Sequence, residues 1–269
     1  MNYWKRYICF TIGKRDYQLP YTLTFQSDFS MKGRSNTRAY IFNPSEETIE
    51  NVAPRKGENQ KITIDAGFTN DHGICIIGEI YHYNVSKQGF KSYLELFISD
   101  SITQFSGIKI SKTWDKGVKA SSVINDIVDI AGIDPGKIEI KNDKTYERGI
   151  TFNTHIQRAL YQMKKETESD FFLRNGKLYF LPKNDPGIKT GIELSSTTGL
   201  LDKPEILAMN KNGKYVFQGS VKSLFNYRVG PGEHINIISE DYNGKCKVIK
   251  GNHYFSENEA YTEMEVVQL

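Results

Sequence analysis

Alternating hydrophobic and polar positions predict β-strands in the first 112 residues. Between residues 61 and 66, Ile62, Ile64 and Ala66 share one face while polar side chains occupy the other, which is typical of a half-buried strand. Other segments are rich in aromatic and β-branched residues, which favour strands. They span residues 7–12, 19–25, 38–42, 74–80 and 93–98.

One short helix is expected within this β-rich region, over residues 43–49. Asn43 is predicted as its N-cap and Pro44 as part of its first turn, because proline tolerates the missing N–H there. Glu46 and Glu47 suit the positive end of the helix dipole. The helix is expected to close before Pro54.

The middle of the chain changes to a helical period. Apolar residues recur at helical spacing from Ala120 to Ala131, and Gly132 stands where such a helix ends. A second helix is predicted around residues 156–163, with Thr154 and Gln157 as a capping box. Residues 171–181 predict a hairpin in which Asn175 and Gly176 form a type I′ turn.

The last part of the chain returns to strands separated by turns. A polar bend is expected at residues 195–200, which includes Gly199 and Leu200. Gly230-Pro231-Gly232 predicts a tight turn, and Asn243-Gly244 predicts another. The chain is therefore predicted to be α+β and mainly β. Its predicted domains are a β unit over 1–112, a small α/β unit over 113–182 and a second β unit over 183–269.

Charge argues against an electrostatic nucleic-acid binder. The 269 residues include 35 Lys and Arg against 32 Asp and Glu, and the three predicted domains carry nets of +3, +1 and −1. No apolar run approaches a membrane span, and the amino terminus lacks the apolar core of a secretory signal. Three distant cysteines suggest neither a disulfide framework nor a zinc site. We expect synthesis and assembly in a reducing cytoplasm.

No motif predicts catalysis, a metal or a cofactor. The five histidines lack zinc-hydrolase spacing, and His72 sits in a turn. A pair of carboxylates meeting across the fold, as a peptidoglycan hydrolase requires, stays open. So does a carbohydrate- or nucleic-acid-binding β module that stacks its ligand on Tyr81, Tyr83, Phe90 and Tyr93, although strand packing explains these aromatics more simply.

Three passages in order resemble the central baseplate hub proteins of contractile phage tails and phage-tail-like particles. The first spans residues 32–48 and continues through Ile62–Phe68 and Ile77–Ile80. The second spans Gly117–Gly132. The third comprises residues 198–204, 223–232, 247–253 and 262–266. Two short departures occur: Asn226-Tyr227 replaces the usual Asn-Pro, and Tyr254-Phe255 replaces the usual Gly-Asp.

The resemblance implies two tail-tube-like β-barrel domains with the α/β domain between them, and a non-enzymatic structural role. Three copies present six barrels to a six-fold tail tube and three middle domains to a three-fold spike. Asn43, Pro44, Gly199, Leu200 and the Gly230-Pro231-Gly232 turn then shape barrel loops. We also predict a near-neutral or acidic lumen, because the net charge is modest and DNA or a tape-measure protein must slide through without sticking.

The partners implied are a homotrimer of this chain, the tail-tube protein, a trimeric spike, the tape-measure protein and baseplate wedge proteins. The spike is expected to be a separate polypeptide because the chain stops at Leu269. Neither a membrane nor a sequence-specific nucleic acid is expected as a partner. The implied location is the baseplate of a virion or phage-tail-like particle, assembled in the bacterial cytoplasm.

Overall fold

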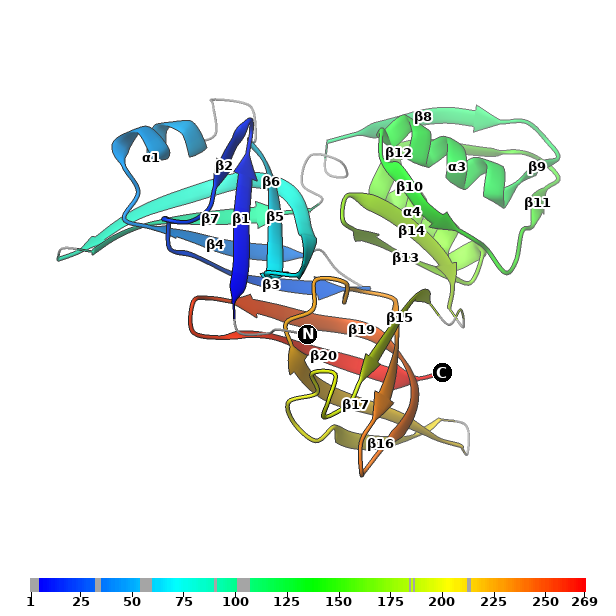
Figure 1. Ribbon diagram of the computed structural model, residues 1–269. Helices are drawn as coiled ribbons and strands as arrows, with labels where there is room; N and C mark the ends of the chain where they lie inside the picture. Colours follow the sequence, from blue (N-terminus) through cyan, green and yellow to red (C-terminus); the bar gives the residue numbers. More distant parts are fainter. Residues whose placement is uncertain are drawn as a thin grey trace. The chain divides into compact units, whose positions relative to one another are not determined.

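The computed structural model describes residues 5–31, 35–53, 60–89, 91–100, 107–183, 185, 187–211 and 214–269 (Figure 1). It divides the chain into two compact units. The first comprises Met1–Ser30, Arg34–Asp100 and Pro186–Leu269, and the second comprises Met31–Gly33 and Ser101–Asp185. We call the second unit the insert. The predicted three-domain division at residues 112 and 182 stays a prediction.

The first unit consists of two β halves. The amino-terminal half contains one helix, α1 (Glu46–Val52), and seven strands: β1 (Arg6–Ile12), β2 (Arg15–Tyr17), β3 (Leu23–Ser30), β4 (Asn36–Phe42), β5 (Gln60–Phe68), β6 (Asp71–Gln88) and β7 (Lys91–Ser99). The carboxy-terminal half contains six strands: β15 (Ile188–Leu194), β16 (Glu205–Lys211), β17 (Lys214–Leu224), β18 (Glu233–Ile238), β19 (Asn243–Phe255) and β20 (Ala260–Gln268).

The two halves share one 13-stranded sheet. Its order is β16-β17-β20-β19-β3-β4-β7-β6-β5-β1-β2, with β18 joining β19 to β15. The halves meet where β3 and β19 pair antiparallel, from Ser30 opposite Lys250 to Phe25 opposite Phe255, and Figure 1 shows these strands side by side. We call this pairing the seam. Among the described residues, the end strands β16 and β2 do not pair with each other, so backbone pairing alone does not close the predicted barrels.

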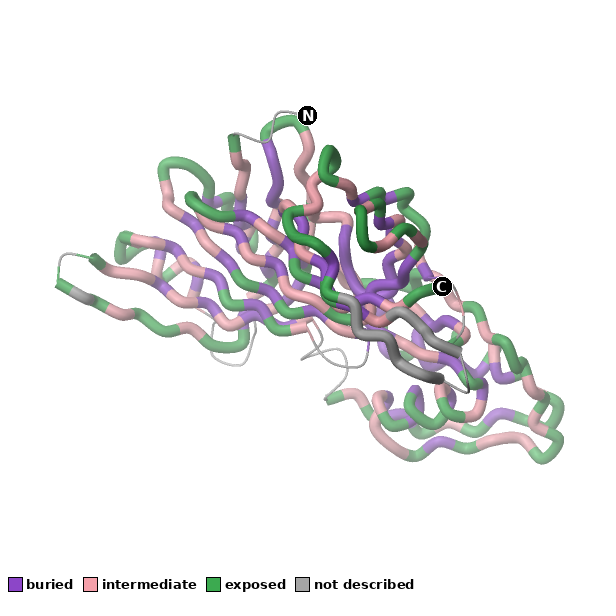
Figure 2. The backbone as a smooth tube through the Cα atoms, turned by 90° about the horizontal axis from the view of Figure 1, so that it is seen from below, coloured by how far each residue is buried: buried purple, intermediate pink, exposed green. Residues whose placement is uncertain are grey.

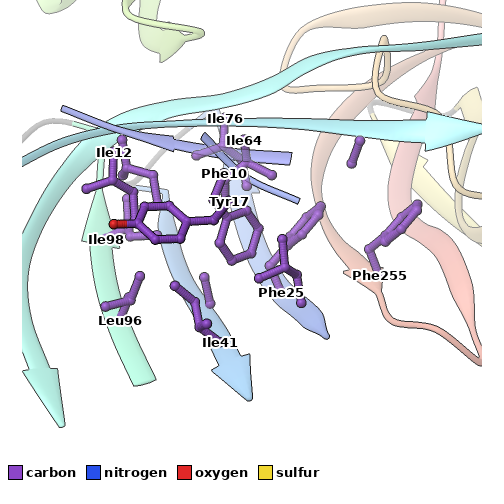
Figure 3. Packing of buried hydrophobic residues seen from close by; sticks show 14 of the residues in the cluster. Phe10, Ile12, Tyr17, Phe25, Ile41, Ile64, Ile76, Leu96, Ile98 and Phe255 are labelled. Atoms are coloured by element: carbon purple, nitrogen blue, oxygen red, sulfur yellow. The ribbon is translucent and has the colours of Figure 1, made fainter. Parts of the chain in front are cut away.

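Each half of the sheet folds around its own core, as the alternation of buried and exposed positions along the strands shows (Figure 2). The amino-terminal core gathers buried aliphatic and aromatic side chains from β1 to β7, including Phe10, Ile41 and Leu96 (Figure 3). Phe255 of β19 stacks on Phe25 with ring centroids 5.8 Å apart, so the seam is packed as well as hydrogen-bonded. The predicted mainly β, α+β class is confirmed.

The insert contains the predicted helices, α3 (Ala120–Ala131) and α4 (Ile156–Glu166), on a common core. Its strands are β8 (Lys109–Trp114), β9 (Val118–Lys119), β10 (Asp134–Ile138), β11 (Thr145–Tyr146), β12 (Ile150–His155), β13 (Ser169–Arg174) and β14 (Lys177–Pro182). Helix α3 ends at Gly132 in the left-handed region, as predicted. Asn175 and Gly176 both have positive φ and connect β13 to β14, which confirms the predicted hairpin.

Four local predictions are wrong for identifiable reasons. Helix α1 is capped by Ser45, whose Oγ accepts a hydrogen bond from the Thr48 amide, so Asn43 and Pro44 both precede the helix. Thr154 belongs to β12, because pairing with β8 keeps that backbone extended; the N-cap of α4 is therefore His155, without a side-chain capping bond.

The third correction concerns Asn243 and Gly244, which lie inside β19 rather than in a turn. The turn falls at residues 239–242, where Ser239 Oγ accepts from the Tyr242 amide and the Ser239 amide donates to the Tyr242 carbonyl. The Ser239 side chain thereby stabilises a turn earlier than the Asn-Gly pair indicates. Strand β3 also begins later than predicted, because the Tyr21 amide donates to the Gln18 carbonyl and forms a turn there.

Candidate functional site

Asn43 and Pro44 shape the exit from β4 in the amino-terminal half. Asn43 has a φ of 50°, which asparagine tolerates better than most residues. Its amide donates to the Ser92 carbonyl at 2.7 Å, and its Oδ1 accepts from the Ser92 amide at 3.2 Å. Asn43 therefore holds the loop against the start of β7, two residues before the cap of α1.

Gly199 and Leu200 lie in the bend that follows β15. Gly199 has a φ of 108°, and its carbonyl accepts from the Leu224 amide at 2.7 Å. Leu200 forms an isolated antiparallel bridge with Ser223 and packs against the carboxy-terminal core. The predicted bend is therefore held to the end of β17.

The Gly230-Pro231-Gly232 turn is buried. The Glu233 amide donates to the Gly230 carbonyl, and Gly232 has a φ of 77°. The Gly232 amide donates to the Val248 carbonyl, while its own carbonyl accepts from Ile188. This turn links β15, β18 and β19, so it belongs with Gly199 and Leu200 to the carboxy-terminal half, while Asn43 and Pro44 belong to the other half.

The sequence prediction missed a broad polar face that crosses the seam. The cores pack on one side of β7, β4, β3, β19, β20 and β17, and the alternate positions of these strands point outward. We call this outward side the polar face. Among the side chains that the structure describes, and with β19 taken from residue 250 to residue 254, its charged positions are four basic and four acidic: Arg38, Lys91, Lys222, Lys250, Asp28, Glu95, Glu263 and Glu265. These described charges balance.

Charges on the polar face neutralise one another laterally, across neighbouring strands. Lys222 lies opposite Glu263 and Lys250 opposite Glu265, with N–O distances of 2.8 and 2.6 Å. The hydrogen bond to Glu263 raises the pKa of Lys222 above its usual value. Each ion pair weakens the electric field above the face, because opposite charges at this spacing largely cancel beyond a few ångströms.

A shallow cavity of about 360 Å³ lies on the polar face beside the seam, lined in part by Asp28, Lys250, Glu263 and Glu265. Asp28 Oδ1 accepts from Asn252 Nδ2 at 2.6 Å, and the two glutamates form the ion pairs described above. A glycosidase-type hydrolase requires one carboxyl group as acid and another as nucleophile or base. The carboxylates of this cavity are instead engaged by cations and an amide.

The remaining candidate groups are structural where the structure describes them. His72 Nδ1 lies 2.9 Å from Asp65 Oδ1, and its ring stacks on Tyr7. Tyr93 packs against Phe42, Tyr81 is 43% exposed, and Phe90 lies outside the described residues. Within the described ranges, no group of three or more His, Cys, Asp or Glu side chains is placed to hold a metal ion.

The cysteines of the chain are free thiols rather than disulfides. Burial raises the pKa of Cys9, Cys75 and Cys246, which keeps these thiols protonated and unreactive. None of the described helices has the length and apolar character that a membrane crossing requires.

Comparisons with known proteins give a fold likeness over nearly the whole chain. No family model matches, and no curated protein matches by sequence. A tail protein from Neisseria meningitidis matches with a TM-score of 0.65 and 11% identity, over 98% of this chain and 97% of that one. A 43 kDa tail protein of prophage MuSo2 from Shewanella oneidensis matches with a TM-score of 0.69 and 10% identity, over 98% of both chains.

A third similar structure comes from Escherichia coli. It is a component of the type VI secretion system described as structurally similar to the bacteriophage T4 tail proteins gp27 and gp5. Its TM-score is 0.66 at 11% identity, over 97% of this chain and 76% of that one. These likenesses show that the chain has the fold of phage tail proteins.

Proposed function

We propose that this protein is the central hub of a phage or phage-tail-like baseplate, and that three copies adapt a six-fold tail tube to a three-fold spike. The observation that carries the proposal is the tail-protein fold over 98% of the chain, together with two β halves joined in one sheet. A trimer of a chain with two β halves offers six β halves to a ring. With one insert per chain, the same trimer offers three inserts to a three-fold spike.

The proposed partners are those of such an adaptor: further copies of this chain, the tail-tube protein, a trimeric spike, the tape-measure protein and baseplate wedge proteins. The proposed location is the assembled particle, built in the bacterial cytoplasm. The role is structural rather than enzymatic, which agrees with the paired carboxylates of the cavity beside the seam.

The polar face is our candidate for the lumen lining. It spans both halves of the sheet, its described charges balance, and Lys222–Glu263 and Lys250–Glu265 pair across neighbouring strands. A surface that lets DNA pass must avoid rows of unpaired Lys and Arg, because phosphate contacts with such rows dominate nucleic-acid affinity. The two ion pairs support the proposal of a near-neutral or acidic lumen.

Coexpression with the tube and spike proteins of the same particle tests the proposal. Electron microscopy of the purified complex is expected to show three copies of this chain between a six-fold ring and a three-fold spike. A chain that joins neither partner, or one that clears peptidoglycan in a zymogram, contradicts the adaptor role. The zymogram addresses the hydrolase directly, and a salt-dependent shift of labelled oligonucleotides addresses a nucleic-acid-binding module.

A further inference from the structure

Two charged residues, Arg6 and Asp71, lie at paired positions at the same end of three neighbouring strands. Arg6 of β1 lies opposite Phe68 of β5, and Phe68 lies opposite Asp71 of β6. In the sheet order these strands are separated from the seam by β4 and β7. Arg6 and Asp71 nevertheless both reach loops of the carboxy-terminal half.

Asp71 binds Arg228 in the loop between β17 and β18. The guanidinium makes two parallel hydrogen bonds to the carboxylate, at 2.6 Å from Nη2 to Oδ1 and at 3.1 Å from Nη1 to Oδ2. The Asp71 side chain is only 18% exposed. A two-pronged Arg–carboxylate contact fixes direction as well as distance, because both groups are planar.

The loop that carries Arg228 is itself held in place. The guanidinium lies 4.2 Å from the centre of the Tyr227 ring, and this ring packs so closely on Gly73 that a Cβ there would stand 2.4 Å from it. Asn226 Oδ1 accepts from the Arg228 amide, and the Val229 carbonyl lies 3.1 Å from Nε2 of buried His253. Arg228 is therefore presented to Asp71 from a rigid support.

Arg6 makes the second contact. Its guanidinium donates through Nη1 to the carbonyl of Glu257 and through Nη2 to the carbonyl of Asn258, at 3.0 Å for the latter. Both carbonyls belong to the turn between β19 and β20. The same turn is contacted from the other side of the seam by Thr22, whose Oγ1 donates to Glu257 Oε1.

We propose that the Arg228–Asp71 and Arg6–turn contacts act as two clamps that fix the angle between the β halves. The seam itself is one strand pairing backed by ring contacts among Phe25, Phe225 and Phe255, and neighbouring strands can twist relative to one another over a range of angles. The clamps tie strands far from the seam to the opposite half, so rotation about the seam requires breaking both. Arg228 and Arg6 are positioning residues in this device. Its purpose rests on the proposed function, since a closed ring needs equal angles between successive β halves.

Distance measurements between spin labels test the clamps on the intact chain. Labels are introduced by Lys61→Cys on β5 and Lys245→Cys on β19, both exposed positions, and the unsubstituted chain gives the background from its buried and half-buried cysteines. The native pair is expected to give one narrow distance distribution. The distribution is expected to widen about twofold or more in the Arg6→Ala/Arg228→Ala double variant, because domain motion is the default where an interface is small.

Two further variants complete the test. Arg228→Lys keeps the charge but loses the two-pronged geometry, so it is expected to widen the distribution to an intermediate extent even where the double variant fails to fold. Lys203→Ala removes an ion pair with Glu240 and Asp241 inside one half and is expected to change nothing. If the Arg228→Lys variant melts cooperatively and its distance distribution is as narrow as that of the native pair, the clamp proposal is wrong. The spin labels test the clamps on the isolated chain, whereas ring assembly tests the proposed function. If the angle depends on the clamps but the chain forms no ring with its partners, only the proposed function is contradicted.

Discussion

Gly251 is a position in the seam that has no room for a side chain. It lies in β19 opposite Phe29 of β3 and Met264 of β20, so strands flank it on both sides. A Cβ at Gly251 would stand 2.4 Å from the Glu263 carbonyl oxygen and 2.5 Å from the Phe29 ring. The ring ends a side chain that can shift, but the carbonyl belongs to the sheet backbone and cannot move alone. We therefore predict that Gly251→Ala forces β19 and β20 apart beside the seam.

The expected cost follows from these distances. Overpacking a close-packed site costs about 3 kcal/mol at the upper end of its usual range. Replacing glycine by alanine returns about 0.5 kcal/mol by restricting the unfolded chain. The net loss of about 2.5 kcal/mol lowers the melting temperature by roughly 5–10 °C for a unit of this size.

Differential scanning calorimetry on the full chain measures this loss. Gly107→Ala in the insert is the control, because a Cβ there meets nothing within 4 Å and its φ is unstrained. Adding Phe29→Leu to Gly251→Ala is expected to recover little, since the Glu263 carbonyl stays in place. A melting temperature within about 1 °C of the native value refutes the steric reasoning, and full rescue by Phe29→Leu shows that the ring alone set the limit.

Three further predictions concern single buried or charged groups. His253→Phe removes the partner of the Val229 carbonyl and is expected to cost about 2–3 kcal/mol in urea unfolding; a change below about 0.5 kcal/mol contradicts this. Asp143→Ala removes the external cap of α3, which binds the Ser121 amide at 2.8 Å, and is expected to cost about 1 kcal/mol; unchanged amide exchange in the first turn of α3 argues against it. The hydrogen bond from Lys112 lowers the pKa of Asp126, so the stability it contributes is complete above its ordinary value of 3.8 and is lost as pH falls through the lowered folded value. Asp126→Asn is expected to flatten the dependence of stability on acid pH, measured as acid unfolding by fluorescence. An unchanged midpoint of acid unfolding contradicts this prediction.

Local signals predicted the insert well. The apolar spacing of α3, its terminal Gly132 and the Asn175-Gly176 turn all act within a few residues of themselves, so the sequence alone carries them. The cap of α1 was harder, because Asn43 and Ser45 are both polar residues suited to that helix start. Ser45 displaced Asn43 as the cap of α1 since its Oγ reaches the Thr48 amide.

The seam and its clamps could not be predicted from local patterns. Phe25 and Phe255 each look like ordinary inward-facing strand residues, and nothing in the sequence pairs them. Arg228 lies in a turn-rich segment where an exposed arginine is the expected outcome. Only the folded register brings its guanidinium to Asp71, which makes this contact a property of topology rather than of motif.

The charge distribution on the polar face also could not be predicted from the sequence. Counting residues gives a near-neutral chain, but the same count fits a surface with separate basic and acidic patches. The register decides between them, because it places Lys222 opposite Glu263 and Lys250 opposite Glu265. Separate patches would hold a charged polymer on the basic side and repel it on the acidic side. Paired charges do neither, so a sheet built this way suits passage of a polymer better than its capture.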